Sequence, residues 1–192
     1  DIIGNIFKNT SSDGIDFDYV ENSKISGNIF YNDNKEKNGL NRDGIDISGT
    51  KNVVVDNNKI FNFGDKCISV GENASVEINN NILSNCNIGI AVKDNSNALI
   101  KNNIVIGNKS AGIALYNKKL EFIFCGHAKV FDSIIWGNGK EISIDETATI
   151  TIKNSVVKGG YESGENIITS KPDFRAILPA YIFKLSEKIL QN

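Results

Sequence analysis

Several residue types that mark common functional classes are absent or rare in this sequence. Its 192 residues contain no methionine, one histidine and three cysteines. Because Cys67, Cys86 and Cys125 are odd in number and lack metal-ligand spacing, neither a disulfide framework nor a zinc site is predicted. His127 has no positioned partner and is interpreted as a loop residue. No apolar run reaches membrane-spanning length, so no membrane insertion is expected, and the net charge of -2 argues against nucleic acid as a partner.

The absence of methionine also means that residue 1 is not an initiator. The chain starts inside a repeat, since residues 4–7 (Gly-Asn-Ile-Phe) match residues 27–30. We therefore expect N-terminal coils and other domains of a longer protein beyond the given sequence, with any signal peptide out of view.

Isoleucine and asparagine are abundant instead, and they recur at a fixed period. The segments 43–64, 65–87 and 88–108 each open on a small residue followed by alternating apolar residues. Neighbours are 22 residues apart in two sets, Ile60, Ile82 and Ile104, and Ile68 and Ile90. Repetition at such a period is typical of a solenoid, in which each repeat buries its apolar face against its neighbours.

Two solenoid folds compete at this period. A leucine-rich repeat needs one strand per repeat and many leucines, whereas here leucine is scarce and each coil carries two or three short β-like segments. Isoleucine favours strands and asparagine favours turns. The sequence therefore predicts an all-β fold, a right-handed single-stranded parallel β-helix of about six to eight coils with roughly 22 residues each. Stacked side chains are expected to hydrogen-bond along one turn, in the column Asn58, Asn80, Asn102, Asp132 and Asn154.

The predicted domains are a β-helix over residues 1–164 and a C-terminal capping segment over residues 165–192. Both prolines, Pro172 and Pro179, lie in the second segment. A short helix is expected there from the spacing of Ile182, Leu185, Ile189 and Leu190. Two polar insertions, 31–42 and 117–128, interrupt the coils and are expected to wall a groove.

Alignment of the coils brings acidic residues together on one outward face. The inward pairs used for the alignment are Ile15/Phe17, Ile45/Ile47, Ile68/Val70, Ile90/Val92 and Ile113/Leu115. Between them lies the outward column Asp16, Asp46, Ser69, Ala91 and Ala114, and before them the corner column Asp13, Asp43, Lys66, Ile88 and Ala111. Coils are about 4.8 Å apart, so two stacked carboxylates repel by about 1 kcal/mol in water and by more where desolvated. A bound cation, a raised pKa or the neighbouring Lys66 would compensate.

Over about residues 1–157 the repeats resemble the parallel β-helix repeats of the pectate-lyase and polygalacturonase superfamily. Polygalacturonases carry Asn-Thr-Asp-Gly, Gly-Asp-Asp and Gly-His-Gly in successive coils. This chain has Asn-Arg-Asp-Gly, Gly-Asp-Lys and Asn-Ile-Gly, at residues 41–44, 64–66 and 87–89.

The resemblance implies that Asp43 is a water-activating acid and Asp65 the general acid. Lys66 stands where the second water-activating carboxylate belongs, and Ile88 replaces the histidine. Because two of the four groups are replaced, hydrolysis of the polygalacturonase type is not expected.

A lyase fits the resemblance better. β-Elimination from a uronate needs a cation that acidifies a proton and a base that removes it, and certain β-helix lyases use an aspartate cluster for calcium and a lysine as base. In this interpretation Lys66, Asp43 and Asp65 are the catalytic residues, and Asp13, Asp16, Asp43 and Asp46 are the ligands of Ca²⁺. Asp46 and the outward residues Lys93 and Tyr116, which lie in one column of neighbouring coils, are expected to contact the substrate. The alternative for Lys66 is a structural one, in which it only neutralises the adjacent carboxylates.

The expected protein is thus a secreted or cell-surface β-helix that engages polysaccharide along its aspartate-lined face. A calcium-dependent uronate lyase is its enzymatic form. The alternative is a non-catalytic structural or adhesive repeat module, in which the acidic columns only tune solubility or bind a stabilising ion.

Overall fold

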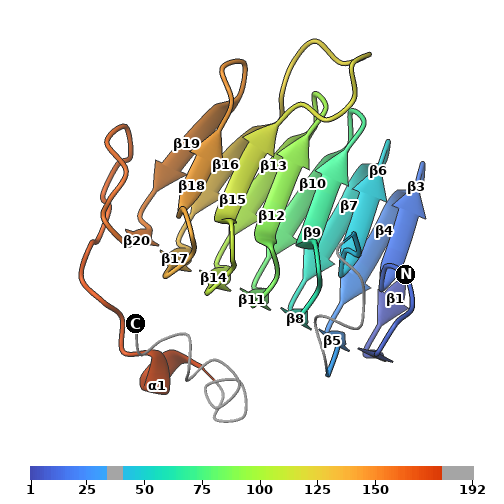
Figure 1. The fold of residues 1–192 in the computed structure, drawn as a ribbon, viewed down its shortest axis with the longest axis horizontal. Coiled ribbons are helices and arrows are strands. Elements are labelled where there is room, and N and C mark those ends of the chain that lie inside the picture. Colours follow the sequence, from blue (N-terminus) through green and yellow to red (C-terminus); the bar gives the residue numbers. More distant parts are fainter. Residues whose placement is uncertain (34–40, 179–192) are drawn as a thin grey trace.

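The chain winds into a rod in which each turn contributes one strand to each of three parallel sheets. A computed structural model describes residues 1–33 and 41–178 (Figure 1). Neighbouring strands in every sheet are successive turns of the same winding, since strand order within a sheet advances by three. This confirms the predicted all-β parallel β-helix.

Sheet A forms one side of the rod. Its strands, in spatial order, are β1 (Ile2–Ile3), β4 (Glu21–Ser26), β7 (Lys51–Asp56), β10 (Ser75–Asn79), β13 (Asn97–Lys101), β16 (His127–Phe131) and β19 (Thr149–Lys153).

Sheet B follows sheet A after a two-residue corner in most coils. Its strands are β2 (Ile6–Lys8), β5 (Ile29–Tyr31), β8 (Lys59–Phe61), β11 (Ile82–Ser84), β14 (Ile104–Ile106), β17 (Ile134–Trp136) and β20 (Val156–Val157).

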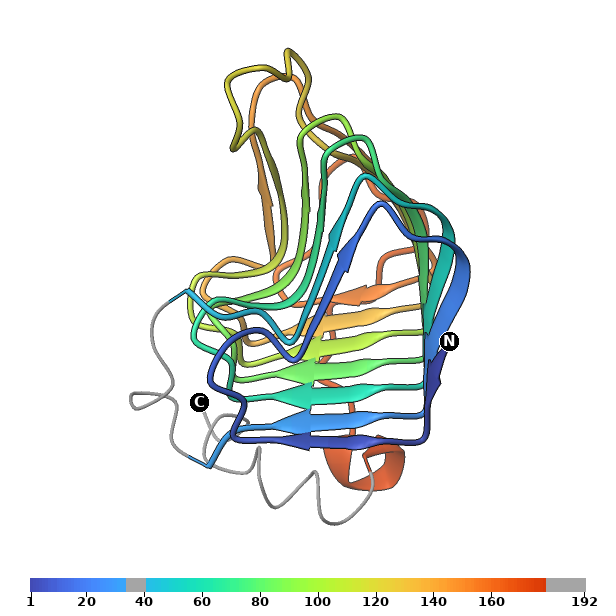
Figure 2. The same ribbon diagram turned by 90° about the vertical axis from the view of Figure 1, so that its right-hand side faces the viewer.

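Sheet C closes each coil and carries the acidic columns. Its strands are β3 (Ile15–Asp18), β6 (Ile45–Ser48), β9 (Lys66–Gly71), β12 (Ile88–Lys93), β15 (Ala111–Tyr116) and β18 (Ile142–Ile144). Figure 2 shows the three sheets around a common interior, with the loop after β15 extending beyond the neighbouring turns.

The inward pairs predicted for sheet C are in register from coil to coil. Ile45 lies opposite Ile15 and Ile68, and Ile90 lies opposite Ile68 and Ile113. Most of these aliphatics are fully buried in one continuous core. Each coil therefore buries its apolar side chains against the coils above and below it.

One predicted column is displaced by a residue. Ile60 pairs with Leu83 and points inward, whereas Ile82 pairs with Lys59 and Ile104 on the outward positions of sheet B. The repeat from β8 to β11 is 23 residues long rather than 22, so equal spacing placed Ile60 in the wrong column.

The prediction of the buried turn column was also wrong, at four of its five positions. The buried ladder between sheets A and B consists of Asn28, Asn58, Asn81, Asn103, Ser133 and Ser155. Asn80, Asn102, Asp132 and Asn154 each precede a ladder residue and adopt positive φ near 50° to 57°. Asparagine and aspartate tolerate that backbone better than most residues, so the corner selects two polar columns side by side.

The C-terminal segment does more than cap the last coil. Glu165 and Ile168 pair with Lys153 and Val156, so the chain first continues the winding. The short helix α1 (Phe174–Ile177) then returns along sheet B, where Phe174 is buried in an apolar cluster. That cluster, the sheet B cluster, contains Phe61, Ile106, Trp136, Phe174 and Leu178. The helix predicted from Ile182, Leu185, Ile189 and Leu190 lies outside the described residues.

Among the described residues no helix is long and apolar enough to cross a membrane.

Candidate functional site

The outward face of sheet C carries a pocket of about 540 Å³ at the aspartate-lined corner. Its lining residues are Asp13, Asn41, Asp43, Asp46, Asp65, Lys66, Tyr116 and Lys118. Six of the eight residues predicted for a site thus meet in one place. The other two border it, because Asp16 lies opposite Asp46 in the sheet and the Lys93 ammonium lies 3.9 Å from an Asp46 oxygen. Asn41 and Lys118 belong to the two predicted insertions, which both reach the pocket.

The corner aspartates have a structural task. The Asp43 backbone N–H donates to Asp13 Oδ1 at 2.6 Å, and the Lys66 N–H donates to Asp43 Oδ1 at 2.8 Å. Each carboxylate therefore satisfies a backbone donor of the next coil, which an irregular corner would otherwise leave unpaired. This explains part of the acidic column without any ligand.

Lys66 lies buried between two of these acids. Its Nζ is 3.5 Å from Asp43 Oδ1 and also contacts Asp65 Oδ2 closely. Burial lowers the pKa of Lys66, but the charge of Asp43 and the hydrogen bond to Asp65 outweigh it, so the pKa is raised. Lys66 is therefore held as a cation.

The pKa of Asp43 is raised as well, which for a carboxyl group favours the neutral form. Burial raises the pKa of Asp43 to about 6, with Lys66 opposing the shift. The two shifts are compatible because one ammonium faces two carboxylates and lies closer to Asp65 than to Asp43. Asp43 thus takes up a proton at a higher pH than an ordinary aspartate.

Lys93 has a different environment from Lys66. It extends across Gly71, where a Cβ would lie only 2.9 Å from Lys93 Cε, so the glycine makes room for the side chain. Within the described chain its amine forms no hydrogen bond, and its one ion pair is with Asp46. Burial lowers the pKa of Lys93, and the Asp46 charge only partly opposes this. Of the two lysines, Lys93 is the better proton acceptor.

Two further polar side chains lie at the site: Tyr116 lines the pocket, and Ser69 lies opposite the lining residue Asp46 in the sheet. The Ser69 hydroxyl is fully buried, and no described group hydrogen-bonds its Oγ. Such an orphan group costs free energy unless a ligand or water pairs with it. Burial raises the pKa of Tyr116 to about 12, with Lys66 opposing, so its phenol stays protonated.

Ser69 is the residue whose role sequence reasoning missed. It stood in the outward column between Asp46 and Ala91, and its neighbour Ala91 is fully buried as well. The sequence did contain one signal for it, since Ser69 follows the acids of the outward column and precedes two alanines. Only the structure shows that this part of the outward column is fully buried, at both Ser69 and Ala91.

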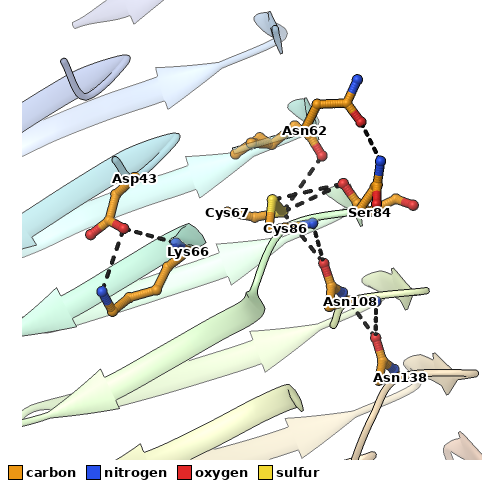
Figure 3. Close-up of a disulfide and its surroundings, with 10 residues drawn as sticks. Asp43, Asn62, Lys66, Cys67, Ser84, Cys86, Asn108 and Asn138 are labelled. Carbon is orange, nitrogen blue, oxygen red and sulfur yellow. Dashed lines mark hydrogen bonds and ion pairs between the residues drawn. A yellow bond between two sulfur atoms is a disulfide. The ribbon is translucent and has the colours of Figure 1, made fainter. Parts of the chain in front are cut away.

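The cysteine prediction was wrong, because Cys67 and Cys86 form a disulfide with a Cα–Cα distance of 5.7 Å (Figure 3). It links the start of β9, directly after Lys66, to the turn that leads into β12. Cys67 occupies the glycine column, but its side chain serves as a crosslink rather than as a small filler. The Cys86 N–H donates to Asn108 Oδ1 at 3.0 Å, which fixes the same turn to the next coil.

The predicted calcium ligands do not form a cage. Asp13 and Asp43 each use an oxygen for a backbone amide, and Asp43 also faces Lys66. Over residues 1–33 and 41–178, no group of three or more His, Cys, Asp or Glu side chains is arranged to hold a metal. Partial desolvation and then the charges of Asp18, Asp46 and Asp13 raise the pKa of Asp16, so the repulsion expected in this column is present. Calcium binding stays a prediction.

A larger groove, of about 670 Å³, follows the outer face of sheet A. Glu77, His127 and Lys129 lie along it without forming a charged cluster, and His127 Nδ1 is 2.7 Å from Thr149 Oγ1. None of the predicted site residues is there. We assign the candidate chemistry to the smaller pocket on sheet C, because the buried lysines and acids converge on it.

Comparison with known proteins supports the parallel β-helix fold. A search of curated proteins gave no significant match. The family model described as right handed beta helix region matches residues 1–126, which include β1 to β15 and the acidic columns. With a match over more than half of its length, the chain belongs to the right-handed beta helix family.

Proposed function

We propose that this chain binds acidic polysaccharide in the pocket on sheet C. The observation that carries the proposal is that Asp46 of the acidic pocket is flanked by two buried polar groups, the Lys93 amine, which makes no hydrogen bond, and the Ser69 hydroxyl, which has no described partner. Folding alone disfavours both groups, and the hydroxyl and carboxylate oxygens of a sugar polymer are the kind of partner that each group lacks.

In the enzymatic form of the proposal the chain is a lyase acting on uronate polymers. Lys93 then replaces Lys66 as the proposed base, since its amine is the more easily deprotonated of the two. It accepts the proton on the carbon next to the sugar carboxylate, the freed electron pair forms a carbon–carbon double bond, and the glycosidic carbon–oxygen bond breaks. The Tyr116 phenol supplies the proton to the departing oxygen.

The second candidate is a structural or adhesive module without catalysis. It is favoured by the corner geometry, in which Asp13 and Asp43 hold backbone amides and Lys66 neutralises Asp43 and Asp65. In that case sugar binding is weak or absent, and the pocket is a by-product of the corner.

The disulfide supports a secreted or cell-surface location for either candidate. Disulfides persist in oxidising compartments and are rare in reducing cytosol. The Cys67–Cys86 bond is fully buried, as expected for a crosslink that serves structure.

The test is titration of polygalacturonate and polymannuronate into the wild type, Lys93→Ala and Lys129→Ala. Lys129 is an exposed lysine of the sheet A groove and serves as the matched control. We expect Lys93→Ala to weaken binding about tenfold or more, the effect of losing a charged hydrogen-bond donor, and Lys129→Ala to leave it unchanged. A rise in ultraviolet absorbance that Lys93→Ala abolishes identifies the lyase, whereas equal binding by Lys93→Ala and the wild type removes the proposal.

A further inference from the structure

The loop between β15 and β16, residues 117–126, exposes large apolar side chains that neither the core nor the pocket uses. Leu120 is 101% exposed, Ile123 80% and Phe124 53%. We call these three residues the apolar tip. The loop projects beyond the neighbouring turns of sheet C and leans toward the N-terminal coils (Figures 1 and 2). Exposed apolar groups gathered beside a polar pocket are typical of binding surfaces.

The loop is held in place at both ends. At its start, Asp94 Oδ1 accepts the backbone N–H groups of Lys118 and Lys119 at 2.7 and 2.9 Å. The Lys119 ammonium lies 2.7 Å from Glu72 Oε1, which anchors the loop to the preceding coils.

At its end the loop is fixed again. The Phe124 carbonyl accepts the Asn95 N–H at 2.9 Å, and the Cys125 N–H donates to Thr147 Oγ1 at 3.0 Å. The backbone that presents the apolar tip is therefore already ordered, so a partner that covers the tip does not have to order the loop first.

The position of the loop indicates the partner. Tyr116 and Lys118 line the pocket, and Leu120 follows Lys118 by only two residues. The loop thus leads directly from the pocket to the tip. A polymer of sugar units that leaves the pocket over this rim meets the tip, and sugar rings present apolar C–H faces that pack on aromatic and aliphatic side chains.

We propose that the apolar tip is a second contact surface for the polysaccharide, which binds units of the same chain beyond those held in the pocket. This inference rests on the proposed function and adds to it a preference for polymers over short oligosaccharides. Pocket and tip act as two linked sites on one ligand.

The experiment compares polygalacturonate with its trisaccharide as calorimetric titrants. The tip variant is Leu120→Ser/Ile123→Ser, the pocket variant is Lys93→Ala, and the control is Ile6→Ser, an exposed apolar residue on sheet B. The tip variant is expected to lose about tenfold in polymer affinity and to bind the trisaccharide like the wild type. The pocket variant is expected to lose affinity for both ligands.

The outcomes separate the two proposals. Undiminished polymer binding by the tip variant overturns the tip inference and leaves the pocket intact. A wild type that binds neither ligand overturns the proposed function and the tip inference with it. Two further results overturn the inference as well. If the wild type sediments with phosphatidylcholine vesicles and the tip variant does not, the tip binds a membrane. If the wild type self-associates in the ultracentrifuge and the tip variant does not, the tip binds a second copy of the chain.

Discussion

Replacement of Asn81 by alanine tests how the corner between sheets A and B stabilises the rod. The Asn81 side chain is fully buried and makes four hydrogen bonds. Its Oδ1 accepts from the Asn58 backbone N–H at 2.8 Å and from Asn58 Nδ2 at 3.1 Å. Its Nδ2 donates to the Val55 carbonyl at 2.9 Å and to Asn103 Oδ1 at 3.0 Å.

The expected loss follows from these contacts. Each buried hydrogen bond contributes about 1 kcal/mol net, and a buried amide left without an acceptor costs about 1–3 kcal/mol. Asn81→Ala should therefore lower the free energy of unfolding by about 4 kcal/mol or more, a large part of the 5–15 kcal/mol that stabilises a typical domain. Asn81→Ser should lose about half as much, because Ser133 fills the same ladder position and accepts the Asn103 N–H at 3.2 Å.

Urea unfolding followed by circular dichroism measures these differences, and the adjacent asparagine supplies the control. Asn80 has φ +57° and makes one exposed side-chain hydrogen bond, to Asp56. Glycine adopts that backbone freely, so Asn80→Gly should change the free energy of unfolding by less than about 1 kcal/mol. An Asn81→Ala variant as stable as Asn80→Gly would refute the assignment of the ladder.

Three more predictions concern the pocket corner. The pKa of Asp43 in the fold, about 6, exceeds its ordinary value of 3.8. Because the unfolded chain loses this proton at lower pH than the fold does, the group destabilises the protein progressively as pH rises from about 4 to 6, by up to about 3 kcal/mol. Asp43→Asn should flatten the pH dependence of the unfolding free energy in that window. An unchanged slope contradicts the raised pKa. Dithiothreitol should lower the unfolding free energy by about 3 kcal/mol in the wild type but not in Cys67→Ala/Cys86→Ala. Saturating calcium should raise the unfolding midpoint by relieving the Asp16–Asp46 repulsion, and should not do so in Asp16→Asn/Asp46→Asn; a wild-type midpoint unaffected by calcium and by chelator removes the calcium prediction.

The parts of the fold that the sequence predicted correctly are those set by strict alternation. The inward pairs of sheet C, such as Ile68 and Val70, recur at positions where one residue of slip would turn every side chain to the other face. Where the coil length changes from 22 to 23 residues, as between Ile60 and Leu83, equal spacing failed. Adjacent asparagines such as Asn80 and Asn81 are alike in composition, and only the backbone decides which one is buried.

The candidate site, too, was only partly predictable from the sequence. Register placed Asp16 beside Asp46, and the structure confirms that pairing. The buried position of Lys66, where Asp43 and Asp65 hold it as a cation, depends on side chains reaching across coils, which spacing does not reveal. The disulfide likewise joins Cys67 to a turn 19 residues away, and spacing alone cannot show that the two sulfurs meet.

Helix α1 changes how the rod behaves as a thermodynamic unit. In a simple solenoid each repeat contacts only its neighbours, so terminal repeats unfold independently of those farther away. Here Phe174 and Leu178 join one apolar cluster with Phe61, Ile106 and Trp136, which come from three different coils. The returning segment couples the coil of Phe61 to those of Ile106 and Trp136, from which the coil of β11 separates it, so a truncation at residue 172 should split one cooperative unfolding transition into a broad, stepwise one.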